Sequence, residues 1–231
     1  MRFAHPVVLA GLFCAAPLAA AADAPPPLKK GEKIVFLGDS ITQAGVGPKG
    51  YVTVVKGALH EAHKDLGIEV IGAGISGNKV SDLQRRLEKD VLAKKPTLVV
   101  IYIGINDVWH GEKDPARGTP KDKFEAGLKE IIGKIKDGGA RVVLCTPTVI
   151  GEKKAGANKL DAQLDEYADV SRKVAKETGS QLCDLRKAFV DHIAKNNSAD
   201  KDRGVLTTDT VHLNDAGNKL VADTIRATID K

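Results

Sequence analysis

A serine near the start of the chain and an aspartate–histidine pair near its end have the side chains that nucleophilic catalysis requires. Ser40 directly follows an apolar run, and Asp209 and His212 stand three positions apart before the last amphipathic segment. A serine hydroxyl attacks a carbonyl well only when a neighbouring base, often histidine, takes its proton. A carboxylate that accepts from the other ring nitrogen fixes the histidine tautomer and stabilises the imidazolium. These three side chains therefore predict acyl transfer through a serine nucleophile.

Four short blocks of sequence contain these residues and two more. The blocks are 38–42 (Gly-Asp-Ser-Ile-Thr), 72–78 (Gly-Ala-Gly-Ile-Ser-Gly-Asn), 104–107 (Gly-Ile-Asn-Asp) and 209–212 (Asp-Thr-Val-His). In this order and at these intervals they resemble the GDSL or SGNH hydrolase family, whose second name comes from one serine, glycine, asparagine and histidine. Those residues correspond to Ser40, Gly77, Asn106 and His212 here. The resemblance extends from Lys33 to the last expected helix, and its strength lies in all four blocks being in register.

The resemblance also implies an oxyanion hole and a reaction. Its donors would be the backbone N–H groups of Ser40 and Gly77 and the side-chain amide of Asn106. A glycine lets the backbone approach a substrate closely, and an asparagine amide is a neutral donor at the end of a strand. The family cleaves carboxylic esters through a covalent acyl-serine, and it implies no metal and no organic cofactor.

The substrate is less well defined by these blocks. The family includes carbohydrate O-acetylesterases, lysophospholipases and thioesterases. Asp39, Trp109 and His110 adjoin the catalytic blocks and are candidates for the substrate pocket. Few large apolar residues occur in the loops 107–118 and 148–158, which favours O-acetyl or another short acyl group on a carbohydrate. A lysophospholipase or thioesterase is the alternative.

Each of these residues also has an ordinary interpretation when taken alone. Ser40 could cap a helix, Asn106 could be a turn residue, Asp209 could cap a loop, and His212 could lie on the surface. Their joint occurrence favours catalysis. The order serine, aspartate, histidine also occurs in α/β-hydrolases, but the G-x-S-x-G elbow of that fold is absent.

Other functions have weaker support in the sequence. Gly72, Gly74 and Gly77 formally match a dinucleotide-binding fingerprint, which makes an oxidoreductase the alternative of another reaction class. The pattern follows the second expected strand rather than the first, and no acidic residue ends the next strand to bind a ribose. A secreted binding module with a decayed site is a third hypothesis, which the intact blocks disfavour. His60 and His63 lack H-E-x-x-H spacing and predict a solvated helix face rather than a metal site.

Alternating apolar and amphipathic segments position the four blocks. The β-rich runs are 33–37, 68–71, 97–103, 141–145 and 181–185, and the segments of helical period are 51–64, 81–94, 121–136, 160–178, 186–195 and 215–229. Strands that are apolar on both faces and alternate with helices predict a parallel sheet covered on each side. The expected fold is α/β, a flavodoxin-like three-layer sandwich with a five-stranded parallel sheet. Ligands of such sheets bind outside the carboxyl ends of the strands.

The N-terminal segment predicts export. Arg2 and His5 precede an apolar run at 7–18 and four alanines at 19–22, a pattern typical of a secretory signal peptide. We expect a signal peptide at 1–22, an extended linker at 23–32 and one hydrolase domain at 33–231, in a secreted or periplasmic protein without a transmembrane segment. The bulky Phe13 before Cys14 disfavours a lipoprotein anchor.

Composition and charge exclude several classes of protein. The chain has 231 residues, of which 42% are hydrophobic and 28% charged, which favours one globular domain over a disordered chain. Its 35 basic and 30 acidic residues are interspersed, and only 4% of residues are aromatic, so a nucleic-acid partner is not expected. Cys145 and Cys183 lie in apolar runs and predict buried thiols, although export would permit a disulfide. The oligomeric state is left open.

Overall fold

The structure is a computed structural model that describes Met1 and residues 27–230. Residues 2–22 of the expected signal peptide, with Cys14, and the first part of the linker lie outside the described residues. The end of the linker contacts the domain: Leu28 packs against the core, and the Lys29 backbone N–H donates to the buried Glu32 carboxylate at 2.9 Å. The C-terminal end of the expected linker therefore contacts the hydrolase domain. Among the described residues, no helix has the length and apolar character needed to cross a membrane.

Five parallel strands form the central sheet in the spatial order β2-β1-β3-β4-β5. They are β1 (Lys33–Gly38), β2 (Glu69–Gly74), β3 (Leu98–Tyr102), β4 (Arg141–Cys145) and β5 (Gln181–Cys183). The aliphatic residues of β1, β3 and β4 are buried, as expected of parallel strands covered on both faces. The strand order is that of flavodoxin-like sheets, so the predicted fold is confirmed.

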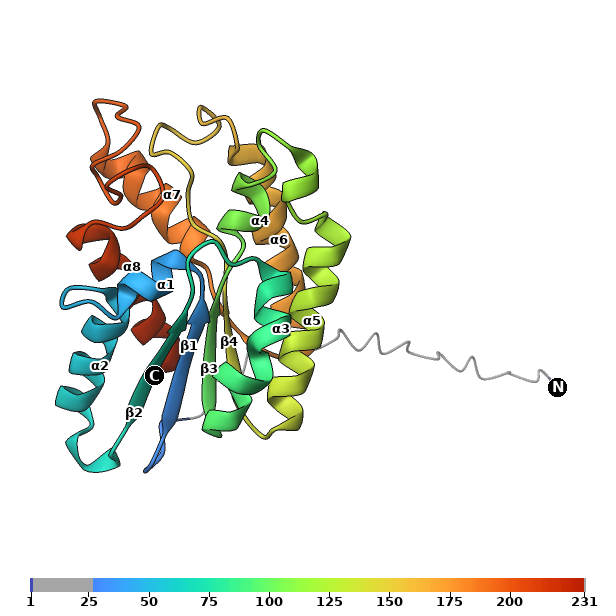
Figure 1. Cartoon of the computed structure of the whole chain (residues 1–231), viewed down its shortest axis with the longest axis vertical. Coiled ribbons are helices and arrows are strands. Elements are labelled where there is room, and N and C mark those ends of the chain that lie inside the picture. Colours follow the sequence, from blue (N-terminus) through green and yellow to red (C-terminus); the bar gives the residue numbers. More distant parts are fainter. Residues whose placement is uncertain (2–26, 231) are drawn as a thin grey trace.

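Helices cover both faces of this sheet (Figure 1). On one face α2 packs against α8 with α7 beside it, and on the other α3, α5 and α6 pack in sequence. The helices are α1 (Ser40–Gly45), α2 (Tyr51–Ala62), α3 (Val80–Asp90), α4 (Ile105–Trp109), α5 (Lys121–Asp137), α6 (Asp161–Thr178), α7 (Leu185–Asn196) and α8 (Asp215–Ile229), with 3₁₀ turns η1 (Lys64–Leu66), η2 (Leu92–Lys94) and η3 (Pro115–Arg117). All six expected helices form. The sequence pattern does not predict α1 and α4, because helices this short do not show a periodicity.

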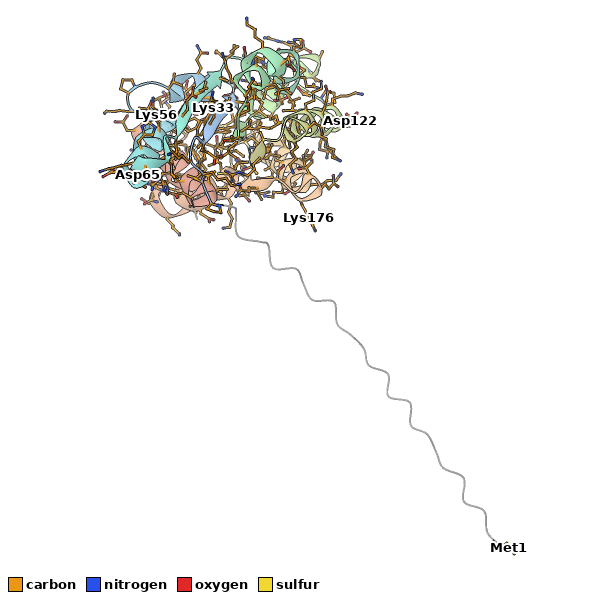
Figure 2. The ribbon with its side chains drawn as sticks, turned by 90° about the horizontal axis from the view of Figure 1, so that it is seen from below. Met1, Lys33, Lys56, Asp65, Asp122 and Lys176 are labelled. Atoms are coloured by element: carbon orange, nitrogen blue, oxygen red, sulfur yellow. The ribbon has the colours of Figure 1, made fainter. Side chains whose placement is uncertain are left out.

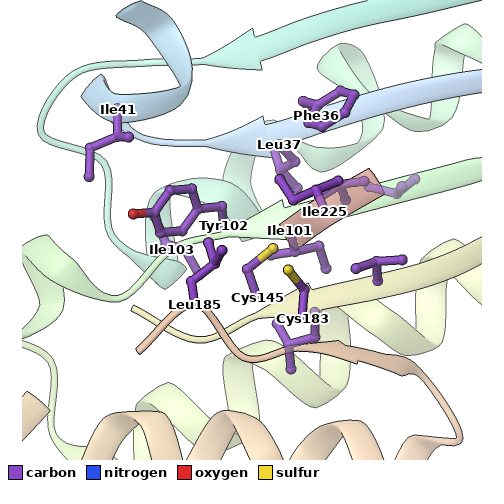
Figure 3. Close-up of a cluster of buried hydrophobic side chains, with 14 of the residues drawn as sticks. Phe36, Leu37, Ile41, Ile101, Tyr102, Ile103, Cys145, Cys183, Leu185 and Ile225 are labelled. Carbon is purple, nitrogen blue, oxygen red and sulfur yellow. The ribbon is translucent and has the colours of Figure 1, made fainter. Parts of the chain in front are cut away.

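The core contains both cysteines of the domain. Cys145 and Cys183 are register partners on β4 and β5, both are buried, and neither forms a disulfide. Figure 3 shows their sulfur atoms among the apolar side chains of Ile101, Ile103 and Leu185. Burial, with a contribution from Cys183, raises the pKa of the Cys145 thiol. The interpretation as buried thiols is confirmed, and Cys145 is a poor nucleophile because the thiolate is the reactive form.

Charged side chains project from the periphery of the domain, as Figure 2 shows for Lys56, Asp65 and Asp122. Many pair with an opposite charge one helical turn away, for example Lys219 with Asp223 on α8. Exposed pairs of this kind each contribute at most about 1 kcal/mol to stability. These exposed charges are therefore solvated and contribute little to the stability of the fold.

His60 lies on α2 and His63 caps its C-terminal end, and the two form hydrogen bonds to separate neighbours rather than sharing an ion. His60 Nε2 lies 2.7 Å from the Ile68 carbonyl oxygen, and His63 Nε2 lies 2.7 Å from the Asp230 carboxylate. Within the part of the chain that the structure describes, no group of three or more His, Cys, Asp and Glu residues is placed to hold a metal ion.

The ends of β1 and β3 form the topological switch point of the sheet. From β1 the chain continues to β2 on one side, and from β3 it continues to β4 on the other. The short helices α1 and α4 begin almost directly after these two strands. In open α/β sheets, ligands bind in the crevice that this reversal creates. The site is therefore to be sought at the residues that follow β1 and β3.

Candidate active site

Ser40, His212 and Asp209 are linked by two hydrogen bonds although they lie far apart in the sequence. The Ser40 Oγ is 2.9 Å from His212 Nε2, and His212 Nδ1 is 2.7 Å from Asp209 Oδ2. Ser40 is the first residue of α1, and the other two residues lie in the loop that precedes α8. The structure thus brings together a hydroxyl, a base and a carboxylate in the order that activation of a serine requires.

The loop from Asp209 to His212 closes around the aspartate carboxylate. Asp209 Oδ1 accepts the backbone N–H groups of Val211 at 3.1 Å and His212 at 2.8 Å. Partial burial alone would raise the pKa of Asp209, but these N–H groups and the His212 ring together hold it below its usual value. Thr210 has a φ of 87°, which is unfavourable for a β-branched residue. A strained turn therefore presents His212 to Ser40, with an anionic carboxylate behind it.

A buried glutamate that no sequence pattern marks supports this loop. Glu152 is fully buried, and its carboxylate accepts the backbone N–H groups of residues 205–207. The neighbouring Gly151 N–H donates to the Thr210 carbonyl at 2.9 Å. No local pattern marks Glu152, because all its partners lie in a distant segment of the chain.

Asp39, rather than Ser40, caps the helix that carries the nucleophile. The Asp39 carboxylate accepts the Ile41 N–H at 2.9 Å, and its side chain is buried. Burial, with a smaller contribution from the charge of Asp107, raises the pKa of Asp39 to about 7. The helix-cap interpretation of Ser40 is therefore wrong. A role of Asp39 in the substrate pocket stays a prediction, which the burial of its side chain against α1 does not favour.

Asp39→Asn is expected to remove a pH-dependent loss of stability. A carboxyl with a pKa of about 7 in the folded chain and an ordinary value of 3.8 binds its proton more tightly when folded. The free energy of unfolding therefore falls as the pH rises from about 4 to about 7. Asparagine keeps the oxygen that caps α1 but has no charge, so the variant should lose this contribution. Urea unfolding of both proteins across this pH range measures the difference, and parallel curves would contradict it.

Gly77 and Asn106 follow β2 and β3, the two strands that flank β1, and β1 leads into Ser40. Gly77 has a φ of 76°, and the position of its missing Cβ is open space. The left-handed backbone therefore requires glycine here, in addition to the close approach of a substrate. Asn106 is buried in the first turn of α4, and its Nδ2 donates to the Asn78 carbonyl at 3.0 Å. An amide nitrogen has two hydrogens, so a second donor is available.

Gly72 and Gly74 make room for α1 and the turn that follows it, rather than for a cofactor. Both lie inside β2. A Cβ on Gly72 would lie 2.2 Å from the Val46 side chain, and one on Gly74 would lie 2.1 Å from the Gln43 backbone nitrogen. In a dinucleotide site these glycines would form a turn against the pyrophosphate. Close packing explains the glycine pattern, and the oxidoreductase alternative loses its support.

Trp109 and His110 border a shallow pocket of about 220 Å³. They follow Asn106 by three and four positions, which places them on the same side of α4 as its side chain. Partial burial and the positive charges of Lys79 and Arg117 hold the pKa of His110 below its ordinary value. A neutral imidazole and an indole therefore lie next to the candidate oxyanion residue. The other residues of the pocket wall are Glu112, Lys113 and Arg117.

The chain belongs to the GDSL-like lipase/acylhydrolase family, whose family model matches residues 36–220. The resemblance seen in the four sequence blocks is thereby confirmed. With the relatives described next, membership identifies the protein as a carboxylic ester hydrolase.

The chain is similar to several acetyl ester hydrolases. An acetylxylan esterase from Geobacillus stearothermophilus is 35% identical over 206 residues, which cover 83% of this chain and 91% of that protein. The crystal structure of the acetyl xylan esterase AlAXEase has a TM-score of 0.81 and 46% identity, covering 84% of this chain and 98% of that chain. An isoamyl acetate-hydrolyzing esterase 1 homolog from Rattus norvegicus is 25% identical over 86% of this chain and 82% of that protein. Solved variants of the Geobacillus enzyme described as catalytic mutants replace a serine, an aspartate or a histidine by alanine.

Proposed function

We propose that the protein removes acetyl groups from carbohydrate through an acyl-enzyme on Ser40. The observation that carries this proposal is the continuous hydrogen-bonded chain from Asp209 through His212 to Ser40 at the switch point of the sheet. The catalytic mutants of the Geobacillus acetylxylan esterase replace the same three residue types. The shared geometry and the similarity to acetyl ester hydrolases both support this reaction.

In the first half of the proposed reaction, His212 Nε2 takes the proton from Ser40 Oγ while this oxygen bonds to the ester carbonyl carbon. The carbonyl oxygen becomes an oxyanion, which accepts from the N–H groups of Ser40 and Gly77 and from the Asn106 amide. Ser40, as the first residue of α1, has an N–H that no carbonyl within the helix can accept. The sugar oxygen then takes the proton from His212 and leaves, so that the acetyl group stays on Ser40.

In the second half, water replaces the sugar. Its proton passes to His212 Nε2 while its oxygen bonds to the acetyl carbon. The bond from this carbon to Ser40 Oγ breaks, the serine oxygen recovers the proton, and acetate leaves. Asp209 stays ionised throughout and stabilises the imidazolium that forms twice in the cycle. Its lowered pKa suits this role.

The pocket beside α4 supports a short acyl group on a sugar. Three of its five lining side chains are charged, so its wall offers little apolar surface to a long acyl chain, which would gain about 0.8 kcal/mol for each buried CH₂. The Trp109 indole presents a large flat face with a polar edge, and a neutral His110 can both donate to and accept from hydroxyl groups. Stacking with hydrogen bonding at the rim suits a carbohydrate better than a lipid tail.

Acyl specificity tests this substrate proposal. Across p-nitrophenyl esters from acetate to octanoate, we expect the highest kcat/KM for acetate and a decline beyond butyrate. The purified protein should also release acetate from acetylated xylan faster than fatty acid from lysophospholipid. A kcat/KM that climbs through octanoate, or faster release of fatty acid, would favour the lysophospholipase alternative instead.

Asn106→Ala is expected to reduce kcat by about 10² to 10³ and to change KM little. The amide would act on an oxyanion that exists only in the transition state, so substrate binding in the ground state is barely affected. Steady-state kinetics with p-nitrophenyl acetate separates the two parameters. A change confined to KM would make Asn106 a substrate-binding residue rather than an oxyanion donor.

We also propose that the protein is exported, which suits a polymeric glycan substrate. The support is the pattern of residues 1–22 in the sequence. After expression in a secreting bacterium, mass spectrometry of the recovered protein should give an N-terminus at Asp23, the residue that follows the four alanines. Protein that stays in the cytoplasm with Met1 or Arg2 at its N-terminus would contradict export.

A further inference from the structure

A largely buried arginine on α3 connects two segments that adjoin the proposed catalytic groups. The Arg86 side chain is 12% exposed and pairs with Asp90 one turn further along the helix at 3.1 Å. Its Nε donates to Asn78 Oδ1 at 2.7 Å, and its Nη2 donates to the Gly38 carbonyl at 2.7 Å. Each nitrogen of this guanidinium therefore has an acceptor at hydrogen-bond distance.

Both of the distant acceptors lie next to proposed catalytic groups. Gly38 is the last residue of β1 and precedes Ser40 by two positions. Asn78 directly follows Gly77, and its backbone carbonyl accepts the Asn106 Nδ2. Asn78 thus binds Arg86 through its side chain and Asn106 through its backbone.

We propose that Arg86 is the positioning residue of the oxyanion hole. It ties the segment of Gly77 and Asn78 to the end of β1 and, through Asn78, holds the Asn106 amide in place. This inference rests on the proposed function, because it assumes that these groups stabilise an oxyanion. Arg86 itself does not contact the substrate, so its effect on catalysis passes entirely through the groups that it holds.

The chemistry of the guanidinium suits this task better than that of an ammonium. Arginine is planar and has donors in fixed directions, so one side chain can bind a carbonyl and an amide oxygen at once. Without Arg86, the loop after β2 would still be held by the Ile75 N–H to the Gly38 carbonyl at 3.2 Å and by the Ser76 N–H to the Gln43 side-chain oxygen at 2.6 Å. The loop would stay attached but move, and displacement of a catalytic group by about 1 Å can cost about 10²-fold in rate.

Three variants test the positioning role with p-nitrophenyl acetate, a substrate that needs no glycan pocket. Arg86→Ala should reduce kcat about 10- to 100-fold with little change in KM, and Arg86→Lys should recover only a small part. The matched control is Arg85→Ala on the same helix, where the side chain is 69% exposed and pairs with Asp82. This control should keep the wild-type kcat. Unchanged kcat in Arg86→Ala, or full recovery by lysine, would overturn the proposal.

A double-mutant cycle separates positioning of Asn106 from general damage to the protein. In an Asn106→Ala background, Arg86→Ala should lose the part of its effect on kcat that passes through Asn106, because that amide is already absent. Effects that simply multiply would overturn the proposal. If Arg86→Ala does not fold, Asn78→Ala takes its place in the cycle. This variant removes the hydrogen bond between Arg86 and the Asn78 side chain and leaves the one between Arg86 and the Gly38 carbonyl. Its effect on kcat should likewise shrink in the Asn106→Ala background, and effects that multiply would again overturn the proposal.

The design also separates this inference from the proposed function. If Ser40→Ala and Asn106→Ala keep wild-type activity, the proposed function fails. If both lose activity while Arg86→Ala keeps its kcat, only the positioning role of Arg86 fails.

Discussion

Ser40→Ala should reduce kcat for p-nitrophenyl acetate by about 10⁶-fold while leaving the protein folded. The substitution removes one hydroxyl, whose described hydrogen bond is to His212 Nε2, and it leaves the hydrogen-bonded triad without a nucleophile. Residual hydrolysis above the rate in water would come from the oxyanion donors and from substrate binding. Steady-state kinetics measures the loss, and circular dichroism with thermal unfolding checks that the fold is retained.

Ser198→Ala serves as the matched control for this change. Ser198 is exposed in the segment after α7, and its replacement should leave both kcat and KM unchanged. An active Ser40→Ala variant beside an equally active control would reject Ser40 as the nucleophile.

His212→Ala is expected to cause a loss of similar size, and the double variant Ser40→Ala/His212→Ala should be no worse than either single variant. A base without its nucleophile has no proton to take, and a serine without its base stays protonated, so the pair acts as one unit. Their 2.9 Å separation makes this coupling direct. If the loss of kcat in the double variant equalled the product of the two single losses, the two residues would act independently.

The fold and the candidate triad could be predicted because their signals are local. Alternating apolar runs and helical periods determine the order of strands and helices, and a parallel sheet brings the carboxyl ends of its strands to one edge. Ser40 and Asn106 follow β1 and β3 directly, so their meeting at that edge follows from topology. The short helices α1 and α4 that carry them show no hydrophobic periodicity in the sequence. The structure alone reveals that Asp39 caps α1.

The supporting residues could not be predicted, because their partners are remote in the chain. Arg86 lies 48 positions from Gly38, and Glu152 lies 54 positions from the Leu206 N–H that it accepts. A lone arginine on an amphipathic helix and a lone glutamate after a strand resemble ordinary surface residues in sequence. Thr210 is a further case, since nothing in its neighbours indicates a positive φ. The sequence thus indicates which groups react, and the tertiary structure shows how they are held.

Labelling with a fluorophosphonate tests the central claim most directly. The reagent phosphonylates a serine oxygen only where a neighbouring base activates it. We expect peptide mass spectrometry to locate a single label on Ser40, with acetate release from acetylated xylan falling in proportion to the labelled fraction. A label on another residue, or acetate release that continues after Ser40 is fully labelled, would contradict the proposed serine mechanism.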